Sequence, residues 1–298
     1  MPELPEVETV VRGLRRTVIS RQIVKIDIRN EKIVANDTKR LSQRLLNATI
    51  TDVKRRGKVI IIYMDNGNVT LIHLKMTGQL IYIDNYGYQY AGGHPEKVYE
   101  QPLPHKHTHL IIYFSDGSRL YYNDLRRFGW IKTVTNEELA TMKSQSLKHL
   151  AGLGQEPCDK DFDITGLRNK IIRRPRAQVF QILLDQSLIS GLGNIYVNEL
   201  LWREKIHPES LACKMSIHRI ETLIPAACRL INEAITYGGT SDNTFLKVDG
   251  KKGSFASQLK VYHREGQSCA RNDGGTIVRV KIGGRSAFYC PICQKKLA

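Results

Sequence analysis

The apolar residues of this 298-residue chain follow two different periods, and the change between them constrains the fold more than any other feature. Between residues 20 and 135 they form short runs of strand length, such as 58–64 and 110–114. Turn sequences containing Asn-Gly at 65–68 and Asp-Gly at 115–118 follow these runs and predict antiparallel hairpins. We therefore expect an antiparallel β-sandwich in this part of the chain, with residues 84–104 as a surface loop.

Residues 166–240 have helical spacing instead. Apolar residues recur every three or four positions from Ile217 to Ala234, which predicts an amphipathic helix with a kink or a boundary at Pro225. Residues 241–258 are polar and rich in glycine, so a mobile loop is expected there, and strand patterns return after it. A β-rich part followed by a helical part and further strands indicates an α+β protein with more than one domain.

The first residues combine a reactive terminus with a helix start. Removal of Met1 would expose the α-amine of Pro2, and a pKa near ~8 would leave part of that amine unprotonated at neutral pH. Such an amine can attack a carbonyl-like carbon and form a Schiff base, with Glu3 within reach for proton transfer. Pro5 and Glu6 suit the first turn of a helix, which would hold the amine in place. A frayed terminus is the alternative interpretation.

The charge balance predicts a polyanionic partner. The chain carries 45 Lys and Arg residues against 29 Asp and Glu residues, a formal net charge of +16. This excess is typical of proteins that bind nucleic acid, although a ribosome- or membrane-surface protein would also show it. The sequence has no run of 18 apolar residues and no signal-peptide pattern. A secreted or membrane protein is therefore not expected.

The six cysteines form two groups. Three lie far apart and are expected to be ordinary reduced thiols: Cys158, Cys213 and Cys228. The other three crowd the C-terminus as Cys269 and the Cys290-x-x-Cys293 pair, a spacing that favours a metal over a disulfide in a cytosolic setting. A ribbon with two C-x-x-C pairs would need a cysteine at position 272, where the chain has Asn272. The alternatives are three cysteines with Asp273 or water, or a site without metal.

Three further segments carry residues suited to DNA in which a nucleotide has been flipped out. Lys58 begins a strand after Arg-Arg-Gly, with its ammonium directed at solvent or phosphate, and Met76 follows His73 at the end of the next strand. Arg126 and Phe128 follow the later hairpin. A guanidinium and apolar wedges of this kind can fill the gap left by a flipped nucleotide. Taken singly, each is equally typical of an ordinary surface or core residue.

Two glycine-containing turns could contact phosphate. Gly191 and Gly193 precede a predicted helix start near Asn194, and the free N–H groups of a helix N-terminus bind phosphate. A plain turn between helices is the alternative. The glycine pair at 283–284 predicts a hairpin turn that presents Arg285.

Together these segments resemble the bacterial formamidopyrimidine-DNA glycosylases, the repair enzymes for 8-oxoguanine. The shared motifs occur in the family's order and cover essentially the whole chain: Pro-Glu-Leu-Pro-Glu-Val-Glu-Thr, Arg-Arg-Gly-Lys, His-Leu-Lys-Met-Thr-Gly, Arg-Arg-Phe-Gly, Gly-Leu-Gly-Asn-Ile-Tyr and Gly-Gly-Arg-Ser-Ala-Phe-Tyr-Cys-Pro-Ile-Cys-Gln. The resemblance implies an α+β multidomain fold, in which an N-terminal antiparallel β-sandwich with flanking helices precedes a helix–two-turns–helix domain and a C-terminal β-hairpin zinc ribbon. The predicted domains are a catalytic sandwich at 1–135, a linker and helix at 136–165, a DNA-binding helical domain at 166–257 with a lesion-capping loop near 240–255, and the ribbon at 258–298.

The resemblance also implies a function. The chain would be a bifunctional DNA glycosylase and abasic-site lyase that excises oxidised purines in base excision repair and cleaves the abasic site by β- and δ-elimination. Pro2 would be the nucleophile, Glu3 the proton donor and acceptor at the sugar, and Lys58 a lysine that contacts phosphate and assists. The implied DNA contacts are His73, Met76, Arg126, Phe128, Asn194 and Arg285. Zinc would be the cofactor, and the implied metal ligands are Cys269, Cys290 and Cys293.

The chain departs from the family's pattern at three places. Asn272 replaces the second ribbon cysteine, Asn198 stands where the helix–two-turns–helix signature usually has Asp, and the 240–245 segment lacks the usual basic residue of the lesion-capping region. Recognition of 8-oxoguanine is therefore a weaker expectation than glycosylase activity.

Two alternative functions remain. An endonuclease VIII-like enzyme for oxidised pyrimidines is disfavoured by Leu4, because that branch typically has Gly there. A catalytically silent DNA-binding relative should lack at least one of the three catalytic residues, and all are present. The expected partner is double-stranded DNA with oxidised bases or abasic sites, bound by a monomer in a bacterial-type cytoplasm, where the protein would be nucleoid-associated.

Overall fold

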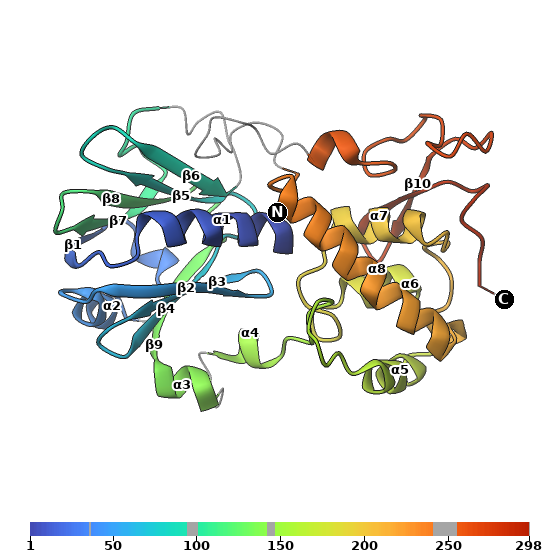
Figure 1. The fold of residues 1–298 in the computed structure, drawn as a ribbon, viewed down its shortest axis with the longest axis horizontal. Coiled ribbons are helices and arrows are strands. Elements are labelled where there is room, and N and C mark those ends of the chain that lie inside the picture. The colour runs from blue at the N-terminus through green and yellow to red at the C-terminus, as the bar shows by residue number, and fades with distance from the viewer. Residues whose placement is uncertain (36, 94–100, 142–146, 241–254, 298) are drawn as a thin grey trace. The chain divides into compact units, whose positions relative to one another are not determined.

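The computed structural model describes residues 1–35, 37–93, 101–141, 147–240 and 255–297. The chain divides into two compact units, of which the first comprises Met1–Ala151 with Ile235–Ala256 and the second Gly152–Ala234 with Ser257–Ala298. Among the helices in the described ranges, none is both long and apolar enough to cross a membrane. Figure 1 shows the elements of each unit.

The first unit contains two antiparallel sheets, as the hairpin signals predicted. One sheet has the order β2-β3-β4-β9, with strands at Ile50–Arg56, Val59–Met64, Asn68–His73 and Trp130–Thr135. The other has the order β1-β7-β8-β5-β6, with strands at Ile23–Ile28, Thr108–Phe114, Arg119–Asp124, Gly78–Ile83 and Gln89–Gly93. The two predicted hairpins therefore lie in different sheets, one in each.

The two sheets share one apolar core because their strands alternate. Ile60 and Ile62 of β3 and Leu110 and Ile112 of β7 all belong to that core, whereas Ile111 packs in a separate cluster on the other face of its sheet. This period of two is the signature of strands with opposite faces. The arrangement confirms the predicted β-sandwich.

Helix α1 (Leu4–Thr17) completes this core. It runs between the two sheets in Figure 1, and it contacts β2 of one sheet and β6 of the other. A stripe of buried apolar residues faces the core: Val7, Val10, Val11 and Leu14. The other helical elements of this unit are α2 (Thr38–Leu45), α3 (Asn136–Thr141), α4 (Lys148–Ala151) and the short 3₁₀ helix η1 (Glu31–Ile33).

The expectation of a surface loop over 84–104 is wrong in part. Residues Gln89–Gly93 form β6, which pairs with β5, and Tyr90 of this strand is buried. The Tyr90 hydroxyl donates to the backbone oxygen of Thr9 at 3.1 Å. A Cβ on Gly13 would lie 1.9 Å from the tyrosine ring, so only glycine leaves room for this ring against α1. The strand was missed because its mixed Gly and Tyr composition hides the period of two.

The second unit is helical with a terminal hairpin. Its helices are α5 (Ile164–Ile172), α6 (Val179–Leu184), α7 (Asn194–Arg203), most of α8 (Ile217–Thr236) and the 3₁₀ helix η4 (Ala212–Lys214), and the 3₁₀ helix η5 (Phe255–Gln258) spans the boundary with the first unit. The predicted stripe on α8 is buried from Ile220 onward, whereas Ile217 is exposed. Pro225 lies inside α8 and does not end it. Strands β10 (Val278–Ile282) and β11 (Arg285–Tyr289) form the predicted C-terminal hairpin.

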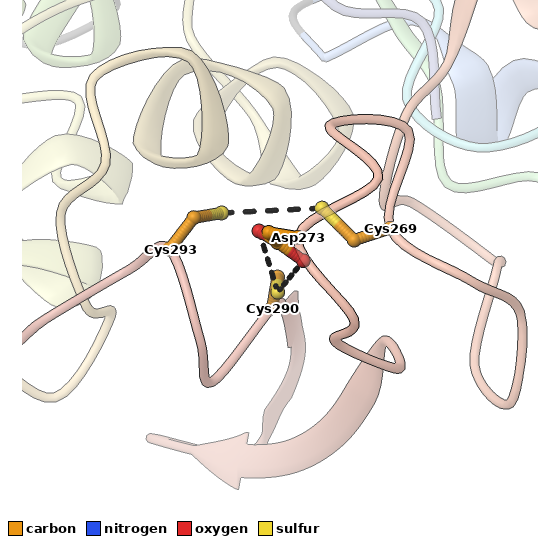
Figure 2. A group of neighbouring side chains, drawn as sticks. All are labelled: Cys269, Asp273, Cys290 and Cys293. Atoms are coloured by element: carbon orange, nitrogen blue, oxygen red, sulfur yellow. Dashed lines mark hydrogen bonds between the residues drawn. The ribbon is translucent and has the colours of Figure 1, made fainter.

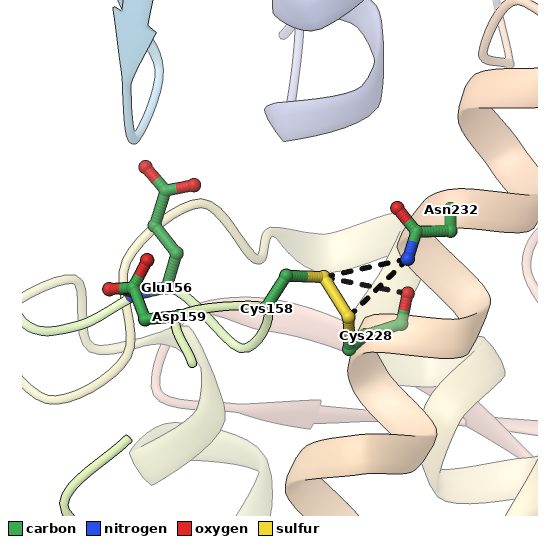
Figure 3. The surroundings of a disulfide bond; sticks show 5 residues. All are labelled: Glu156, Cys158, Asp159, Cys228 and Asn232. Carbon is green, nitrogen blue, oxygen red and sulfur yellow. Dashed lines mark hydrogen bonds between the residues drawn. A yellow bond between two sulfur atoms is a disulfide. The ribbon is translucent and has the colours of Figure 1, made fainter. Parts of the chain in front are cut away.

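The expectation that Cys158 and Cys228 are reduced thiols is wrong in this structure, because the two form a disulfide with a Cα–Cα distance of 4.9 Å. Figure 3 shows the bond between the loop before α5 and helix α8, with Asn232 beside it. The Asn232 amide lies 3.4 Å from the Cys228 sulfur. The 70-residue separation explains why spacing alone did not reveal the pair. Cys213 is outside any disulfide.

Candidate catalytic site, DNA-contacting residues and metal centre

The start of the chain is buried and bonded in place. Pro2 is buried, and Glu3 has an exposed fraction of 3%. Glu3 is the N-cap of α1 and forms a capping box with Glu6, in which a Glu6 carboxylate oxygen accepts from Glu3 N at 2.9 Å and the Glu3 carboxylate accepts from Glu6 N. A capping box fixes the direction in which the chain enters a helix. The residues before α1 are thus held in one conformation.

Three charged side chains surround the terminal amine. Burial lowers the pKa of the Met1 α-amine, Glu3 and Glu6 act to raise it, and Lys58 acts to lower it further. Lys58 has an exposed fraction of only 7%, so its ammonium does not extend into bulk solvent. Glu3 and Lys58 are thus close enough to the Met1 amine, one residue before Pro2, to affect its pKa.

The turn that carries Lys58 is tied to α1. Gly57 adopts a left-handed conformation with φ +55°, which suits a tight turn between β2 and β3. The Arg55 guanidinium donates to Gly57 O at 3.0 Å and to the Glu8 carboxylate at 3.2 Å. Because Glu8 lies on α1, the hairpin with Lys58 and the helix behind Pro2 are connected directly.

Glu6 has a second role that the sequence did not reveal. Its carboxylate accepts hydrogen bonds from Thr240 N at 2.9 Å and from the Thr240 hydroxyl at 3.0 Å. Thr240 begins the predicted lesion-capping loop near 240–255, and residues 241–254 of that loop lie outside the described residues. The buried Glu6 carboxylate thus contacts both Glu3, the residue after Pro2, and Thr240 at the beginning of this segment.

Met76, Arg126 and Phe128 lie together at the surface. Met76 is 40% exposed and Phe128 is 54% exposed. The Arg126 guanidinium lies 3.2 Å from the Met76 sulfur, and its central carbon lies 4.7 Å from the centre of the Phe128 ring. We call these three residues the surface triad. Large apolar side chains exposed as a group are typical of a contact surface.

A buried carboxylate holds the loops of the surface triad. Asp124 is fully buried and accepts hydrogen bonds from the Thr77 hydroxyl, from Arg126 N at 3.2 Å and from Gly129 N at 2.8 Å. His73 does not join the triad. Its ring is half-buried, accepts a hydrogen bond from Lys75 N at 3.0 Å and packs against Trp130.

In the second unit, the two predicted phosphate contacts lie at one helix start and one hairpin turn. Asn194 is the first residue of α7, after Gly193 as the N-cap. Arg285 is exposed and follows Gly283 and Gly284, which have φ values of +55° and +78°. Ile282 pairs with Arg285, so the turn has two residues, as predicted. The Asn194 amide nitrogen donates to Ser286 O at 3.2 Å, which brings the two sites close together.

The C-terminal cysteines form a cluster that could hold a metal ion. The ligand atoms of Cys269, Asp273, Cys290 and Cys293 all lie within 4.8 Å of one another. Figure 2 shows Asp273 reaching into the group of three sulfurs. The Cys269 and Cys293 sulfurs are 4.0 Å apart, and the Cys290 sulfur lies 3.5 Å from a carboxylate oxygen of Asp273.

These distances fit a tetrahedral ion. Metal–sulfur bonds of about 2.3 Å give a tetrahedron with edges of about 3.8 Å, close to the separations found here. Asn272, at the position of the missing cysteine, adopts a left-handed conformation with φ +54°, and the next residue supplies the fourth ligand atom. Gly275 N donates to the Asp273 carboxylate at 2.9 Å, which lowers the pKa of that carboxyl and favours its charged form. Of the alternatives left open by the sequence, the donor set matches three cysteines with Asp273.

Arg271 connects this cluster to α7. Its guanidinium donates to the Cys293 sulfur at 3.2 Å, to Trp202 O at 2.8 Å and to Arg203 O at 3.0 Å. Burial raises the pKa of Cys293 to about 12. A bound cation and a neighbouring guanidinium both favour the thiolate that a metal requires.

Glu199 is a further anchor that spacing did not reveal. It is 1% exposed, and its carboxylate accepts from the backbone N–H groups of Lys260, Val261 and Tyr262, each at 2.9 Å. Burial raises the pKa of this carboxyl, whereas the three hydrogen bonds act to lower it. The only sequence signal is its place three residues after the Gly-Leu-Gly-Asn-Ile-Tyr segment.

Comparisons with known proteins agree with this arrangement. The family model described as the formamidopyrimidine-DNA glycosylase N-terminal domain matches residues 1–131, and the one described as the H2TH domain of the same proteins matches residues 153–245. A formamidopyrimidine-DNA glycosylase of an Exiguobacterium species is 38% identical over 297 residues, covering 99% of this chain and all of the relative. One from a Ruegeria species is 37% identical over 296 residues, with the same coverage.

Solved structures show the same similarity. The Lactococcus lactis Fpg in complex with DNA containing an abasic site has a TM-score of 0.84 and 32% sequence identity, over 99% of this chain and all of that one. The wild-type Lactococcus lactis Fpg bound to DNA with an N7-benzyl-Fapy-dG lesion gives the same values. These similarities run through both units, and the chain therefore belongs to the formamidopyrimidine-DNA glycosylase family.

Proposed function

We propose that this protein excises oxidised purines from duplex DNA and cleaves the resulting abasic site through a Schiff base on Pro2. The observation that carries the proposal is the buried chain start: Pro2, Glu3 and Lys58 are all buried, and burial lowers the pKa of the α-amine of Met1, the residue next to Pro2. Removal of Met1 would leave the Pro2 amine in these surroundings. A buried amine with a lowered pKa is unprotonated at neutral pH more often than an exposed one. That is the state in which it can act as a nucleophile.

The reaction follows from that geometry once Met1 has been removed. The lone pair of the Pro2 nitrogen forms a bond to C1′ of the damaged nucleotide, and the glycosidic bond breaks as the base leaves and takes up a proton. The bonded Pro2 nitrogen then loses its proton, and its lone pair expels the ring oxygen to give an iminium between Pro2 and C1′, with Glu3 as the carboxyl group that transfers the proton to that oxygen. The iminium acidifies C2′, so loss of a proton there expels the 3′ phosphate, and a second elimination expels the 5′ phosphate. Water then hydrolyses the iminium and frees Pro2.

The remaining predicted residues have supporting roles in this proposal. Lys58 contacts phosphate near the reacting sugar, and the surface triad fills the gap left by the flipped nucleotide. Asn194 and Arg285 bind phosphates, Asn194 at a helix N-terminus and Arg285 at a hairpin turn. His73 has a different role here, because its half-buried ring packs against Trp130 and supports the loop before Met76.

The cysteine cluster is proposed to hold zinc. Three thiolates and a carboxylate are suitable zinc ligands, and a closed set of four protein ligands is typical of structural sites. When bound, zinc would stabilise the fold around the hairpin with Arg285, and it would take no part in the reaction. Cys269, Asp273, Cys290 and Cys293 would be its ligands.

Borohydride trapping tests the proposal. Purified protein, shown by mass spectrometry to lack Met1, is incubated with a duplex that carries one 8-oxoguanine opposite cytosine. We expect a covalent adduct that maps to Pro2, because borohydride reduces the iminium. Pro2→Gly is expected to lose the adduct while it still binds duplex containing a tetrahydrofuran abasic analogue.

The other outcomes separate the alternatives. An adduct on an abasic duplex but not on the 8-oxoguanine duplex would keep the lyase and move the lesion preference elsewhere. No adduct on either duplex, with tight binding retained, would identify a silent DNA-binding relative. A salt-independent affinity between about 50 and 200 mM would contradict DNA binding itself.

A further inference from the structure

We propose that Asn198 is a positioning residue whose buried amide fixes Asn194 and Arg285 relative to each other, and that a carboxylate at this position would not do so in this chain. The inference rests on the proposed function, in which Asn194 and Arg285 bind DNA phosphates. Asn198 itself has an exposed fraction of 1% and therefore acts through its neighbours.

One amide connects three backbone groups. The Asn198 nitrogen donates to Asn194 O at 2.6 Å and lies 3.5 Å from Ser286 O, and the Asn198 oxygen accepts from Phe288 N at 2.5 Å. The first contact lies within the opening turn of α7. The other two are with β11, the strand that begins at Arg285.

The same carbonyl receives a second amide. Asn194, which starts α7, donates its side-chain nitrogen to Ser286 O at 3.2 Å. Ser286 directly follows Arg285, so the carbonyl that accepts from both amides belongs to the residue next to the arginine. An amide nitrogen carries two hydrogens, and Asn194 therefore has a second donor for a phosphate oxygen.

The partners determine the orientation of the Asn198 amide. A backbone N–H must face its oxygen, and the two backbone carbonyls must face its nitrogen. An ionised Asp has only acceptors. At position 198 it would keep the hydrogen bond from Phe288 N, but its second oxygen would face the carbonyls of Asn194 and Ser286. Two acceptors at hydrogen-bond distance repel, and an unpaired carboxylate oxygen would be buried.

The spacing of the two phosphate contacts matters because both must reach one DNA backbone together. Arg285 is exposed directly after a two-residue turn, and the hydrogen bonds that connect its strand to α7 are made by Ser286 and Phe288. If the amide bridge is lost, the hairpin can shift relative to α7. Binding one phosphate would then no longer favour binding the other.

Equilibrium binding to duplex DNA with a tetrahydrofuran site tests this coupling between about 50 and 200 mM salt. Four proteins form the cycle: the wild type, Asn198→Asp, Arg285→Ala and the double variant. For Asn198→Asp we expect an affinity about tenfold below the wild type. Arg285→Ala should reduce the salt slope by about 0.9, as expected for one lost phosphate contact. The factor by which Arg285→Ala lowers the affinity should be at least about threefold smaller in the Asn198→Asp background than in the wild type.

Two further variants separate positioning from stability. Asn198→Ala removes the bridge without adding a charge and should show the same non-additivity, so the test survives if Asn198→Asp fails to fold. Leu230→Ala, at a fully buried position of α8, should lower the midpoint of thermal unfolding but leave the affinity within about twofold of the wild type.

The outcomes are distinct. Additive effects of the substitutions at 198 and 285, or an equal loss of affinity in Leu230→Ala at matched stability, would overturn the role of Asn198. Failure of the wild type to bind the duplex at all would instead overturn the proposed function. Non-additivity in both 198 backgrounds, with unchanged affinity in Leu230→Ala, is the expected result.

Discussion

The two units assemble their functional residues in different ways. In the first unit the catalytic residues have local bonds, between Glu3 and Glu6 and from Arg55 to Gly57 in the turn with Lys58. Longer-range bonds from Arg55 to Glu8 and from Thr240 to Glu6 add to them. In the second unit the hydrogen bonds that connect the C-terminal segment to α7 span 62 residues from Val261 to Glu199 and 90 residues from Phe288 to Asn198. Local bonds survive changes elsewhere, whereas the hairpin depends on several distant segments at once.

This difference predicts how each region responds to substitution. Changes in the first unit should affect the chemistry with little effect on stability. Changes in the second unit should affect stability, metal retention and DNA affinity without abolishing the chemical step. Four experiments test this contrast, from the largest expected effect to the smallest.

Glu3→Gln should reduce base excision by about 10²- to 10⁴-fold, the usual contribution of a general acid or base. The amide oxygen of Gln can still accept the hydrogen bond from Glu6 N, so the start of α1 should remain intact. Single-turnover excision with saturating protein measures the effect, and thermal unfolding should change little.

Glu137→Gln is the matched control, because it neutralises an exposed carboxylate of the same unit. Its excision rate should stay within about threefold of the wild type. A rate for Glu3→Gln as high as that of this control would show that Glu3 is only a helix cap.

The Cys158–Cys228 disulfide should contribute about 2–4 kcal/mol to the free energy of unfolding, since it closes a 70-residue loop. Scanning calorimetry should therefore show a lower unfolding midpoint for the double variant Cys158→Ser/Cys228→Ser. A reducing agent should lower the midpoint of the wild type in the same way and leave the double variant unchanged.

Cys213→Ser provides the control, as this thiol lies outside the disulfide. It should keep both the wild-type midpoint and the response to the reducing agent. The excision rate at 25 °C should be equal in all of these proteins, because the catalytic residues belong to the other unit. An excision rate that depended on the disulfide would contradict the contrast between the units.

How much the sequence reveals follows the division between local and distant contacts, in both units. The strands, the hairpin turns and the start of α1 could be predicted, because an Asn-Gly turn or a capping pattern acts over a few residues. The composition of β6 hides its period of two, and the contact of Tyr90 with Gly13 on α1 joins segments far apart in the chain. The pairing of Cys158 is hidden in the same way, because Cys228 is 70 residues away. Such partners are set by packing, which spacing does not encode.

The metal centre shows both cases at once. Cys290 and Cys293 could be identified from spacing, and the structure groups them with Cys269 as predicted. The sequence left the fourth ligand open, because the position that usually supplies it holds Asn272. The left-handed turn at Asn272 and the hydrogen bond from Gly275 together orient Asp273, and neither can be read from residue identities alone.

Asp273→Ala should weaken zinc retention by at least about tenfold, because a closed four-ligand site would lose one ligand. Asp273→Cys should retain zinc at least as well as the wild type, since it completes a set of four thiolates. Competition with a chromogenic chelator, together with metal analysis of the purified protein, measures both.

Asn272→Gly is the control for the metal experiment. Glycine tolerates the left-handed conformation and removes no ligand, so zinc retention should equal that of the wild type. If Asp273→Ala held zinc as tightly as this control, water or another residue would be the fourth ligand.

Phe128→Ala should have the smallest effect, a loss of about two- to fivefold in affinity for duplex containing a tetrahydrofuran site. An exposed cation–π pair contributes about 0.5–1 kcal/mol, and Arg126 lies over the Phe128 ring in this way. The loss should be absent with single-stranded DNA, because only a duplex has a stack with a gap to fill. Phe128→Leu keeps an apolar wedge and should recover part of the affinity. Equal losses on single- and double-stranded DNA would mean that the surface triad binds DNA without entering the stack. The chemistry of the first unit would then depend less on its local side chains than the contrast with the second unit requires.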